Sequence, residues 1–372
     1  MKQRTRGVPL SGPYLDEREE QLVLDVLRSG RLSLGPAIDQ FEEAFAARVG
    51  APYAAAVSSG TAGLHLLCVS AGIGAGDEVI TPPYSFAASA NCFIYEGGVP
   101  VFADVDPRTL NMDPAAVEAA VTPRTRAIVA VDIYGYPCEL DELRAIAERH
   151  GLALIQDSCE ALGAEYKGSS LGSHGPPAVF AFYPNKQITT GEGGMVTTHS
   201  EEEWRLLRSL RNQGRGDSGG WLEHVRLGFN YRMDDVRAAL GLGQLEKLDE
   251  ILELRAVVAD RYAELLGGID GVELPLADDA EHRRSWFVYV VKLPDNESRE
   301  RVIAHFESED IGFNRYLPSI HLQPYMRERY GFGEGMCPVS EDASSRTLAL
   351  PFFTALDRES QERVTEALAA AL

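Results

Sequence analysis

One lysine of the chain stands where a buried strand is expected to end. The apolar run 179–183 stops at Pro184, presents Lys186, passes through the Gly-rich turn 191–194 and resumes as a second apolar run over 195–198. A lysine so close to a core is commonly a surface residue whose stem lies on apolar neighbours while its amine reaches water. The alternative is a desolvated, uncharged amine that bonds a carbonyl cofactor covalently. The other chemically suited residues have to decide between these interpretations.

Two further polar features follow predicted strands. The small-residue turn 58–62 separates the strand 53–57 from a helix over 61–70, and Asp157 follows the apolar strand 152–156. The carboxyl ends of parallel strands face one side of a sheet, so these features can converge with Lys186 on one ligand. An anion site at a helix start, a carboxylate and an amine match the phosphate, ring nitrogen and aldehyde of pyridoxal phosphate. Taken alone, the turn is as often a plain helix cap, and Asp157 is more often a loop or cap residue.

The chemistry expected from this set is proton transfer next to an electron-withdrawing ring. Asp157 would keep the pyridine nitrogen protonated, which makes the ring an electron sink. The amine of Lys186, once free, would act as general base and acid at the carbon that loses a proton. Phe86, near the start of a predicted helix over 85–95, is the best-placed aromatic residue to stack on the ring, and core packing is the alternative for it.

The elements that must position these residues alternate between strands and helices. Strands separated by helices of about ten residues or more imply βαβ units and a mostly parallel sheet. Two helices over 16–29 and 37–49 precede them. The predicted strands cover 53–57, 78–80, 100–104, 127–133 and 152–156, and the helices between them cover 61–70, 85–95, 114–121 and 139–150.

The character of the chain changes after residue 196, which predicts a second domain. A helix over 201–212 and a long Gly-rich loop over 214–229 lead to a long helix or helix pair over 234–266, which would join two domains. Strands over 286–293 and 347–350 and helices over 298–309 and 358–370 indicate a smaller α+β domain. We predict an N-terminal segment 1–30 that packs near the small domain, a large domain over 31–250 and a small C-terminal domain over 251–372.

Composition excludes several classes of partner. The 372 residues are 45% hydrophobic and 24% charged, and their net charge of −21 comes without a basic stripe, which argues against nucleic acid and anionic membranes. No apolar run approaches the length of about 18 residues that a membrane span needs, and no signal peptide follows the basic start. The five cysteines are widely spaced without a C-x-x-C pair, which is typical of reduced core residues. We therefore expect a cytoplasmic protein without a metal site.

Seven sequence blocks carry a family resemblance. They are Ser58 to His65 (SSGTAGLH), Thr81 to Phe86 (TPPYSF), Asp157 to Gly163 (DSCEALG), Phe182 to Gly194, Phe229 to Met233 (FNYRM), Ile320 to Pro324 (IHLQP) and Ser345 to Pro351 (SRTLALP). In this order they resemble the DegT/DnrJ/EryC1/StrS family of sugar aminotransferases, and the resemblance spans nearly the whole chain.

The resemblance implies an architecture, an assembly and a cofactor site. The fold would be of fold type I, like aspartate aminotransferase, with a large, mostly parallel-sheet domain and a smaller C-terminal α+β domain. The protein would work as a homodimer with active sites at the subunit interface. Lys186 would bond pyridoxal phosphate and Asp157 would face its ring nitrogen. Gly60, Thr61 and Ala62 would bind its phosphate.

Further roles follow from the same resemblance. Glu160 would lie near the phenolic oxygen of the cofactor. Asn230 would reach the phosphate of the neighbouring subunit, which gives the loop over 214–229 a purpose. Tyr316 and His321 would line the sugar site.

Two positions depart from the family pattern. Many members have Ser five residues before the lysine, and this chain has Ala181, which removes one hydroxyl from the phosphate site. The residue at position 160 is often His or Gln, and here it is Glu160. A carboxylate would repel the phenolate unless it is protonated or turned aside, which weakens Glu160 as a direct ligand.

The expected activity is transfer of an amino group from L-glutamate to a nucleotide-linked keto-sugar. The segment 316–324 and Glu160 favour a 4-keto-6-deoxy sugar. A keto-cyclitol or another antibiotic precursor is the alternative acceptor. A dehydratase branch of the family replaces the lysine with His, and Lys186 argues against it. A non-catalytic regulatory protein on the same fold is disfavoured by the intact Lys186 and Asp157.

Overall fold

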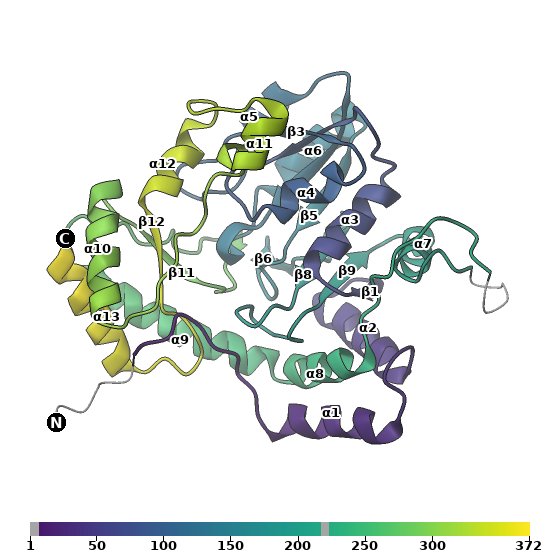
Figure 1. Cartoon of the computed structure of the whole chain (residues 1–372), viewed down its shortest axis with the longest axis horizontal. Coiled ribbons are helices and arrows are strands. Elements are labelled where there is room, and N and C mark those ends of the chain that lie inside the picture. The colour runs from purple at the N-terminus through teal and green to yellow at the C-terminus, as the bar shows by residue number, and fades with distance from the viewer. Residues whose placement is uncertain (1–6, 217–222) are drawn as a thin grey trace.

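The computed structural model of the protein describes residues 7–216 and 223–372 (Figure 1). The first six residues of the predicted N-terminal segment and residues 217–222 of the predicted loop lie outside the described residues. The described chain forms an α/β body around one large sheet, with a second, smaller group of helices and strands beside it. This arrangement confirms the predicted fold class.

The large sheet has seven strands in the order β1-β9-β8-β5-β4-β2-β3. Only β9 runs against its neighbours, and the pairs β5–β8, β4–β5, β2–β4 and β2–β3 are parallel. The carboxyl ends of six strands therefore face the same edge, as the sequence predicts. The strands are β1 (Tyr53–Val57), β2 (Glu78–Thr81), β3 (Val99–Phe102), β4 (Thr125–Val131), β5 (Ala153–Asp157), β8 (Ala178–Ala181) and β9 (Gly194–Thr198).

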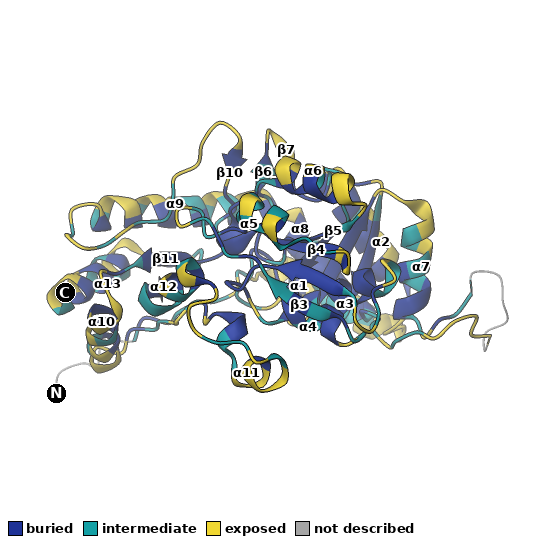
Figure 2. Ribbon diagram, turned by 90° about the horizontal axis from the view of Figure 1, so that it is seen from above, coloured by how far each residue is buried: buried dark blue, intermediate teal, exposed yellow. Residues whose placement is uncertain are grey.

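Helices cover both faces of this sheet, and each face has its own apolar core. Successive side chains of a strand point to opposite faces. On β8, Val179 packs into the core beneath α3 and α4, while Phe180 packs into the core beneath α2, with its ring 5.2 Å from that of Phe45. The covering helices are α2 (Pro36–Val49), α3 (Gly60–Ser70), α4 (Ala88–Ile94), α5 (Pro114–Ala120), α6 (Leu140–His150) and α7 (Glu201–Arg211). Buried strands lie between helices with exposed outer sides (Figure 2).

The smaller part surrounds the antiparallel pair β11–β12 and has a third apolar core. Its strands are β11 (Tyr289–Lys292) and β12 (Thr347–Leu350), and its helices are α10 (Asn296–Ser308), α12 (Pro338–Arg346) and α13 (Arg358–Ala371). α11 (Pro324–Tyr330) lies between them in sequence, but its buried residue Met326 packs into the core beneath α3 and α4. A further small sheet joins β6 (Glu165–Tyr166), β7 (Ser169–Ser170) and β10 (His282–Arg283). Two single-turn 3₁₀ helices are η1 (Ile133–Gly135) and η2 (Ile320–Leu322).

A helix pair links the two parts, as the pattern over 234–266 predicts. α8 (Asp235–Glu246) packs against α1 and α2, and α9 (Leu248–Leu266) continues into the small part after a break at Lys247 (Figure 1). The helix expected over 85–95 is shorter, because Ser85 to Ala87 remain in the loop that leads into α4.

The N-terminal segment has contacts with both parts. The Val8 N–H donates to the Asp310 carbonyl at 2.9 Å, in the small part. α1 (Glu17–Ser29) packs on α8, where Arg18 pairs with Glu246 at 2.7 Å. The domain boundaries at residues 30 and 250 stay a prediction. No helix within the described ranges is long and apolar enough to cross a membrane.

Candidate functional site

A cavity of about 830 Å³ opens at the carboxyl ends of β1, β4, β5 and β8. We call it the strand-end cavity. Its wall combines these strand ends with residues 314–323 of the small part. Seven of the ten site residues expected from the sequence line it, namely Gly60, Thr61, Phe86, Asp157, Glu160, Lys186 and Tyr316. The structure therefore brings together the three strand-end features on which the sequence argument depends.

The start of α3 forms one end of the strand-end cavity. Ser59 caps the helix, since its Oγ accepts from the Ala62 N–H at 3.1 Å and its carbonyl accepts from the Gly63 N–H at 3.1 Å. The N–H groups of Gly60 and Thr61 precede any intrahelical bond, so they are the ones suited to an anion. The Ala62 N–H, also expected to bind phosphate, is engaged by the cap.

Glycine is needed at position 60 because the helix approaches β8 closely. A Cβ on Gly60 would lie 2.8 Å from Ala181 Cβ and 2.8 Å from Cys159 Sγ. Ala181, the position that departs from the family pattern, lines the same wall. This end of the strand-end cavity therefore offers backbone N–H groups and the Thr61 side chain.

Asp157 ends β5 and is held in a fixed orientation. One carboxylate oxygen accepts from Ser89 Oγ at 3.0 Å and the other from the Cys159 N–H at 3.2 Å. Ser89 is fully buried on α4, and its hydroxyl lies 2.6 Å from that of Ser85. Sequence reasoning missed Ser89, and the only available signal was two serines at a spacing of four residues.

Lys186 lies in the loop after β8, and its amine is turned inward. The side chain is 13% exposed, Nζ is 3.5 Å from Glu160 Oε1 and 3.8 Å from the ring centroid of Phe287. This placement decides against the interpretation as a lysine whose amine reaches open water. Neither Phe287 nor its contact with the amine could be foreseen, because β11 and the loop before it are distant in sequence.

Glu160 is a buried carboxylate turned toward both the lysine and the main chain. Its second oxygen accepts from the Tyr134 N–H at 2.9 Å. Burial raises the pKa of Glu160 more than the neighbouring Lys186 and the Tyr134 N–H lower it. The carboxyl group therefore holds a proton more readily than an exposed glutamate does. This fits the expected need for a protonated or turned-aside group at this position.

Two aromatic residues border the strand-end cavity. The Phe86 ring is 64% exposed, so it has a free face for a flat ligand and is not a core residue. The Tyr316 hydroxyl accepts from Asn185 Nδ2 at 3.2 Å, and burial raises the pKa of Tyr316 to about 12. Asn185 Oδ1 is buried and lacks a partner within the described residues.

Three expected site residues do not line the strand-end cavity, namely Ala62, His321 and Asn230. His321 is fully buried, and its Nε2 lies 3.0 Å from Glu341. Asn230 is exposed and forms an isolated β-bridge with Asn212. Its predicted role concerns a neighbouring subunit and stays a prediction.

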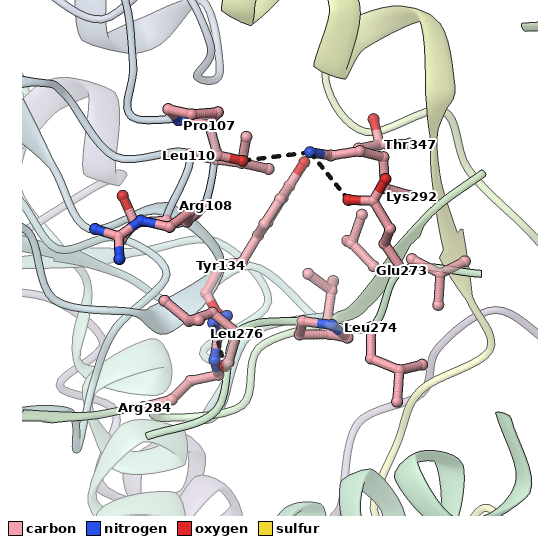
Figure 3. A pocket seen from close by; sticks show the side chains of 15 residues that line it. Pro107, Arg108, Leu110, Tyr134, Glu273, Leu274, Leu276, Arg284, Lys292 and Thr347 are labelled. Carbon is pink, nitrogen blue, oxygen red and sulfur yellow. Dashed lines mark hydrogen bonds and ion pairs between the residues drawn. The ribbon is translucent and has the colours of Figure 1, made fainter. Parts of the chain in front are cut away.

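A second cavity of about 250 Å³, which we call the Lys292 cavity, lies between the loop 107–110 and residues 273–276 (Figure 3). Lys292 Nζ lies 3.5 Å from Glu273 and donates to the Pro107 carbonyl at 3.3 Å. Its amine is thus engaged on both sides. Among the described residues, no group of three or more His, Cys, Asp or Glu could hold a metal ion in either cavity or elsewhere.

The strand-end cavity fits pyridoxal phosphate by the chemistry of its groups. Helix N–H groups suit the phosphate, the fixed carboxylate of Asp157 suits a protonated ring nitrogen, and the amine of Lys186 suits the aldehyde. A family model described as the DegT/DnrJ/EryC1/StrS aminotransferase family matches residues 13–369. The protein is thus a pyridoxal-phosphate-dependent aminotransferase. More narrowly, the chain belongs to the DegT/DnrJ/EryC1/StrS aminotransferase family.

Individual relatives agree with this assignment. The spore coat polysaccharide biosynthesis protein SpsC of Bacillus subtilis is 38% identical, with 99% of this chain and 98% of that protein covered. GDP-perosamine synthase of Caulobacter vibrioides is 40% identical over 85% of this chain and 86% of its own. The solved PLP form of Spr1654 from Streptococcus pneumoniae is 27% identical, with a TM-score of 0.94 over 98% of both chains. The predictions of family, enzyme class and cofactor are confirmed.

Proposed function

We propose that the protein transfers an amino group from L-glutamate to the keto group of a nucleotide-linked sugar, with a 4-keto-6-deoxy sugar as the favoured acceptor. The observation that carries the proposal is the meeting of Lys186, Asp157 and the start of α3 in one cavity of about 830 Å³. That volume lies in the upper part of the range of about 300–1,000 Å³ for small-molecule sites. The similarity to GDP-perosamine synthase supports the choice of a sugar nucleotide.

Lys186 is the proposed catalytic residue. When bound, pyridoxal phosphate supplies a ring that withdraws electrons from the substrate carbon that loses its proton. Nζ of Lys186 takes up that proton and returns it at the neighbouring position, as general base and then general acid. The neighbouring ring of Phe287 and the buried carboxyl of Glu160 keep the amine at the cavity wall.

Asp157 is the proposed partner of the ring nitrogen. Its carboxylate is oriented by Ser89 and the Cys159 N–H, so little rearrangement is needed when the cofactor binds. The N–H groups of Gly60 and Thr61 are the proposed phosphate donors. The exposed ring of Phe86 is the proposed stacking partner.

The proposal includes a homodimer located in the cytoplasm. Asn230 would leave its own subunit and reach the phosphate in the site of the neighbouring one. Its exposure and its absence from the wall of the strand-end cavity of its own chain are compatible with such a role. Mixing two inactive variants, Lys186→Ala and Asn230→Asp, tests it. Recovery of activity in mixed dimers supports a shared site, and no recovery contradicts it.

The substrate proposal is tested with the purified holoenzyme and a panel of acceptors. L-Glutamate as donor should yield an aminated product with a nucleotide-linked 4-keto-6-deoxy sugar, detected by mass spectrometry and NMR. If the enzyme aminates the 3-keto isomer or a keto-cyclitol but not the 4-keto-6-deoxy sugar, the proposed acceptor is wrong. If another amino acid supports turnover and L-glutamate does not, the proposed donor is wrong.

A further inference from the structure

A buried arginine on α9 contacts the main chain of the candidate catalytic lysine. Arg255 is only 2% exposed. Its Nη2 donates to the Lys186 carbonyl at 2.9 Å and its Nη1 donates to the Phe287 carbonyl at 3.1 Å. The Phe287 ring is the one that lies 3.8 Å from the lysine amine. The guanidinium of Arg255 thus connects the main chain of Lys186 with the main chain of Phe287, whose ring contacts the lysine amine.

The Arg255 guanidinium is held by carbonyl groups. A third, longer bond runs to the Trp286 carbonyl at 3.5 Å, and Nε has no partner among the described residues. Burial lowers the pKa of Arg255 to about 10. Burying a charge without a counter-charge is costly, and apolar side chains often serve packing equally well. A charge at this place therefore calls for an explanation beyond packing.

The loop that carries Lys186 is anchored at that residue on both sides. The Lys186 N–H donates to the Tyr183 carbonyl at 2.9 Å, which closes a turn on one side. The bond from Arg255 fixes the carbonyl on the other side. With both main-chain groups held, the amine moves only by rotation about its side-chain bonds. Reactions that depend on such placement lose about 100-fold for a shift of about 1 Å.

We propose that Arg255 is a positioning residue for Lys186, which fixes the lysine main chain and the Phe287 ring relative to each other across the junction of α9 with the large sheet. This inference rests on the proposed role of Lys186. It assigns to α9 a part in the site, although none of its described side chains lines the strand-end cavity.

The chain offers a matched control for Arg255. Arg284 is also buried, donates to the carbonyls of Tyr134 and Leu276 at 3.3 Å each, and has a pKa lowered to about 10 by burial. It lines the Lys292 cavity, and these hydrogen bonds hold segments other than the loop of Lys186. The same substitution at both positions separates the loss of a buried charge from the loss of lysine placement.

The experiment compares Arg255→Gln, Arg255→Lys and Arg284→Gln as purified full-length proteins. We expect Arg255→Gln to lower kcat by about 10- to 100-fold with substrate KM within about threefold. The absorbance change on adding pyridoxal phosphate to the cofactor-free protein should slow by a similar factor. Arg255→Lys should recover part of both losses. Arg284→Gln should lower the melting temperature about as much as Arg255→Gln does. Its kcat and its rate of absorbance change on adding pyridoxal phosphate should stay within about threefold of the wild-type values.

Two results would overturn the proposal. One is a folded Arg255→Gln with wild-type kcat and absorbance rate, and the other is an Arg284→Gln that lowers both as much as Arg255→Gln does. If Arg255→Gln does not fold, wild-type values in Arg255→Lys overturn it. A Lys186→Ala variant that keeps the absorbance change would instead show that the proposed role of Lys186 fails, whatever the Arg255 variants do.

Discussion

Two lysines of this protein have similar burial and the same distance to a carboxylate, yet lie in different chemical surroundings. Lys186 is 13% exposed and its Nζ lies 3.5 Å from Glu160. Lys292 is 15% exposed and its Nζ lies 3.5 Å from Glu273. The first lines the strand-end cavity and the second lines the Lys292 cavity.

The difference lies in the partners of the two amines. Glu160 is 9% exposed and bonded to the Tyr134 N–H, whereas Glu273 is 61% exposed. Water screens the ion pair between Lys292 and Glu273, so this pair contributes little to the free energy of unfolding. Lys292 also donates to a carbonyl, while the amine of Lys186 lies against a ring at the cavity wall. The two lysines therefore do not differ in burial, and the proposed reactivity of Lys186 depends on the surroundings of its carboxylate partner.

The largest expected effect separates the two lysines directly. Lys186→Ala should lower turnover by about 1,000-fold or more, because both the covalent anchor and the proton carrier are lost. Borohydride should no longer fix pyridoxal phosphate to the protein. Lys292→Ala should keep turnover within about twofold and lower the free energy of unfolding by about 1 kcal/mol or less. Cofactor fixed by borohydride in Lys186→Ala would contradict the comparison.

A smaller effect is expected at Asp157, the second charged group of the strand-end cavity. Asp157→Asn should retain the cofactor but slow the half-reaction with glutamate by about 100-fold or more, because the ring nitrogen is no longer held protonated. Single-turnover absorbance measurements follow this step. Asp104→Asn is the control, since Asp104 accepts from the Val339 and Ser340 N–H groups at the start of α12. A half-reaction of wild-type speed in Asp157→Asn would exclude the proposed role.

The two glutamates allow a test by pH. The pKa of Glu160 is raised above its ordinary value of 4.5, so its contribution to stability is fully present below that value and is lost as pH rises through its folded-state pKa. The unfolding free energy of wild type relative to Glu160→Gln should therefore fall as pH rises above about 4.5, by about 1.4 kcal/mol per pH unit until the folded-state pKa is passed. Urea titrations between about pH 4 and 8 measure it. A difference that grows with pH would show that the folded protein lowers this pKa.

Glu273→Gln is the control for this pH series. Glu273 is exposed, and substitutions at such positions change stability by about 0.5 kcal/mol or less. Turnover should also stay near the wild-type value. A large loss of turnover in Glu273→Gln would contradict the proposal that the reaction takes place in the strand-end cavity and not in the Lys292 cavity.

The smallest expected effect concerns the anion end of the strand-end cavity. Ala181→Ser adds a hydroxyl on the wall next to Gly60, where many family members have one. One added neutral hydrogen bond contributes about 1 kcal/mol, so the dissociation constant of pyridoxal phosphate should fall about fivefold. Equilibrium titration of the cofactor-free protein measures it. Unchanged or weaker binding would mean that the close approach of α3 leaves the hydroxyl no productive orientation.

The sequence could predict the strand ends because their causes are local. Apolar runs define β5 and β8, small residues define the turn before α3, and the rule that parallel strands end at one edge brings Asp157, Thr61 and Lys186 together. The expectation for His321 shows the limit of that reasoning. Its motif adjoins Tyr316 in sequence, but the single-turn helix η2 directs its side chain toward Glu341 and not toward the strand-end cavity.

Sequence alone determined the class of fold through the alternation of strands and helices, and the family and cofactor through seven motifs spread along the chain. It also determined the three features at the strand ends, because each of these is written in a short run of residues. Only the tertiary structure decided what surrounds the lysine. Glu160, Phe287 and Arg255 reach it from three separate segments, and no periodicity links those segments to the loop of Lys186. Their contacts depend on how α9 and the small part pack against the sheet, which is a property of the whole folded chain.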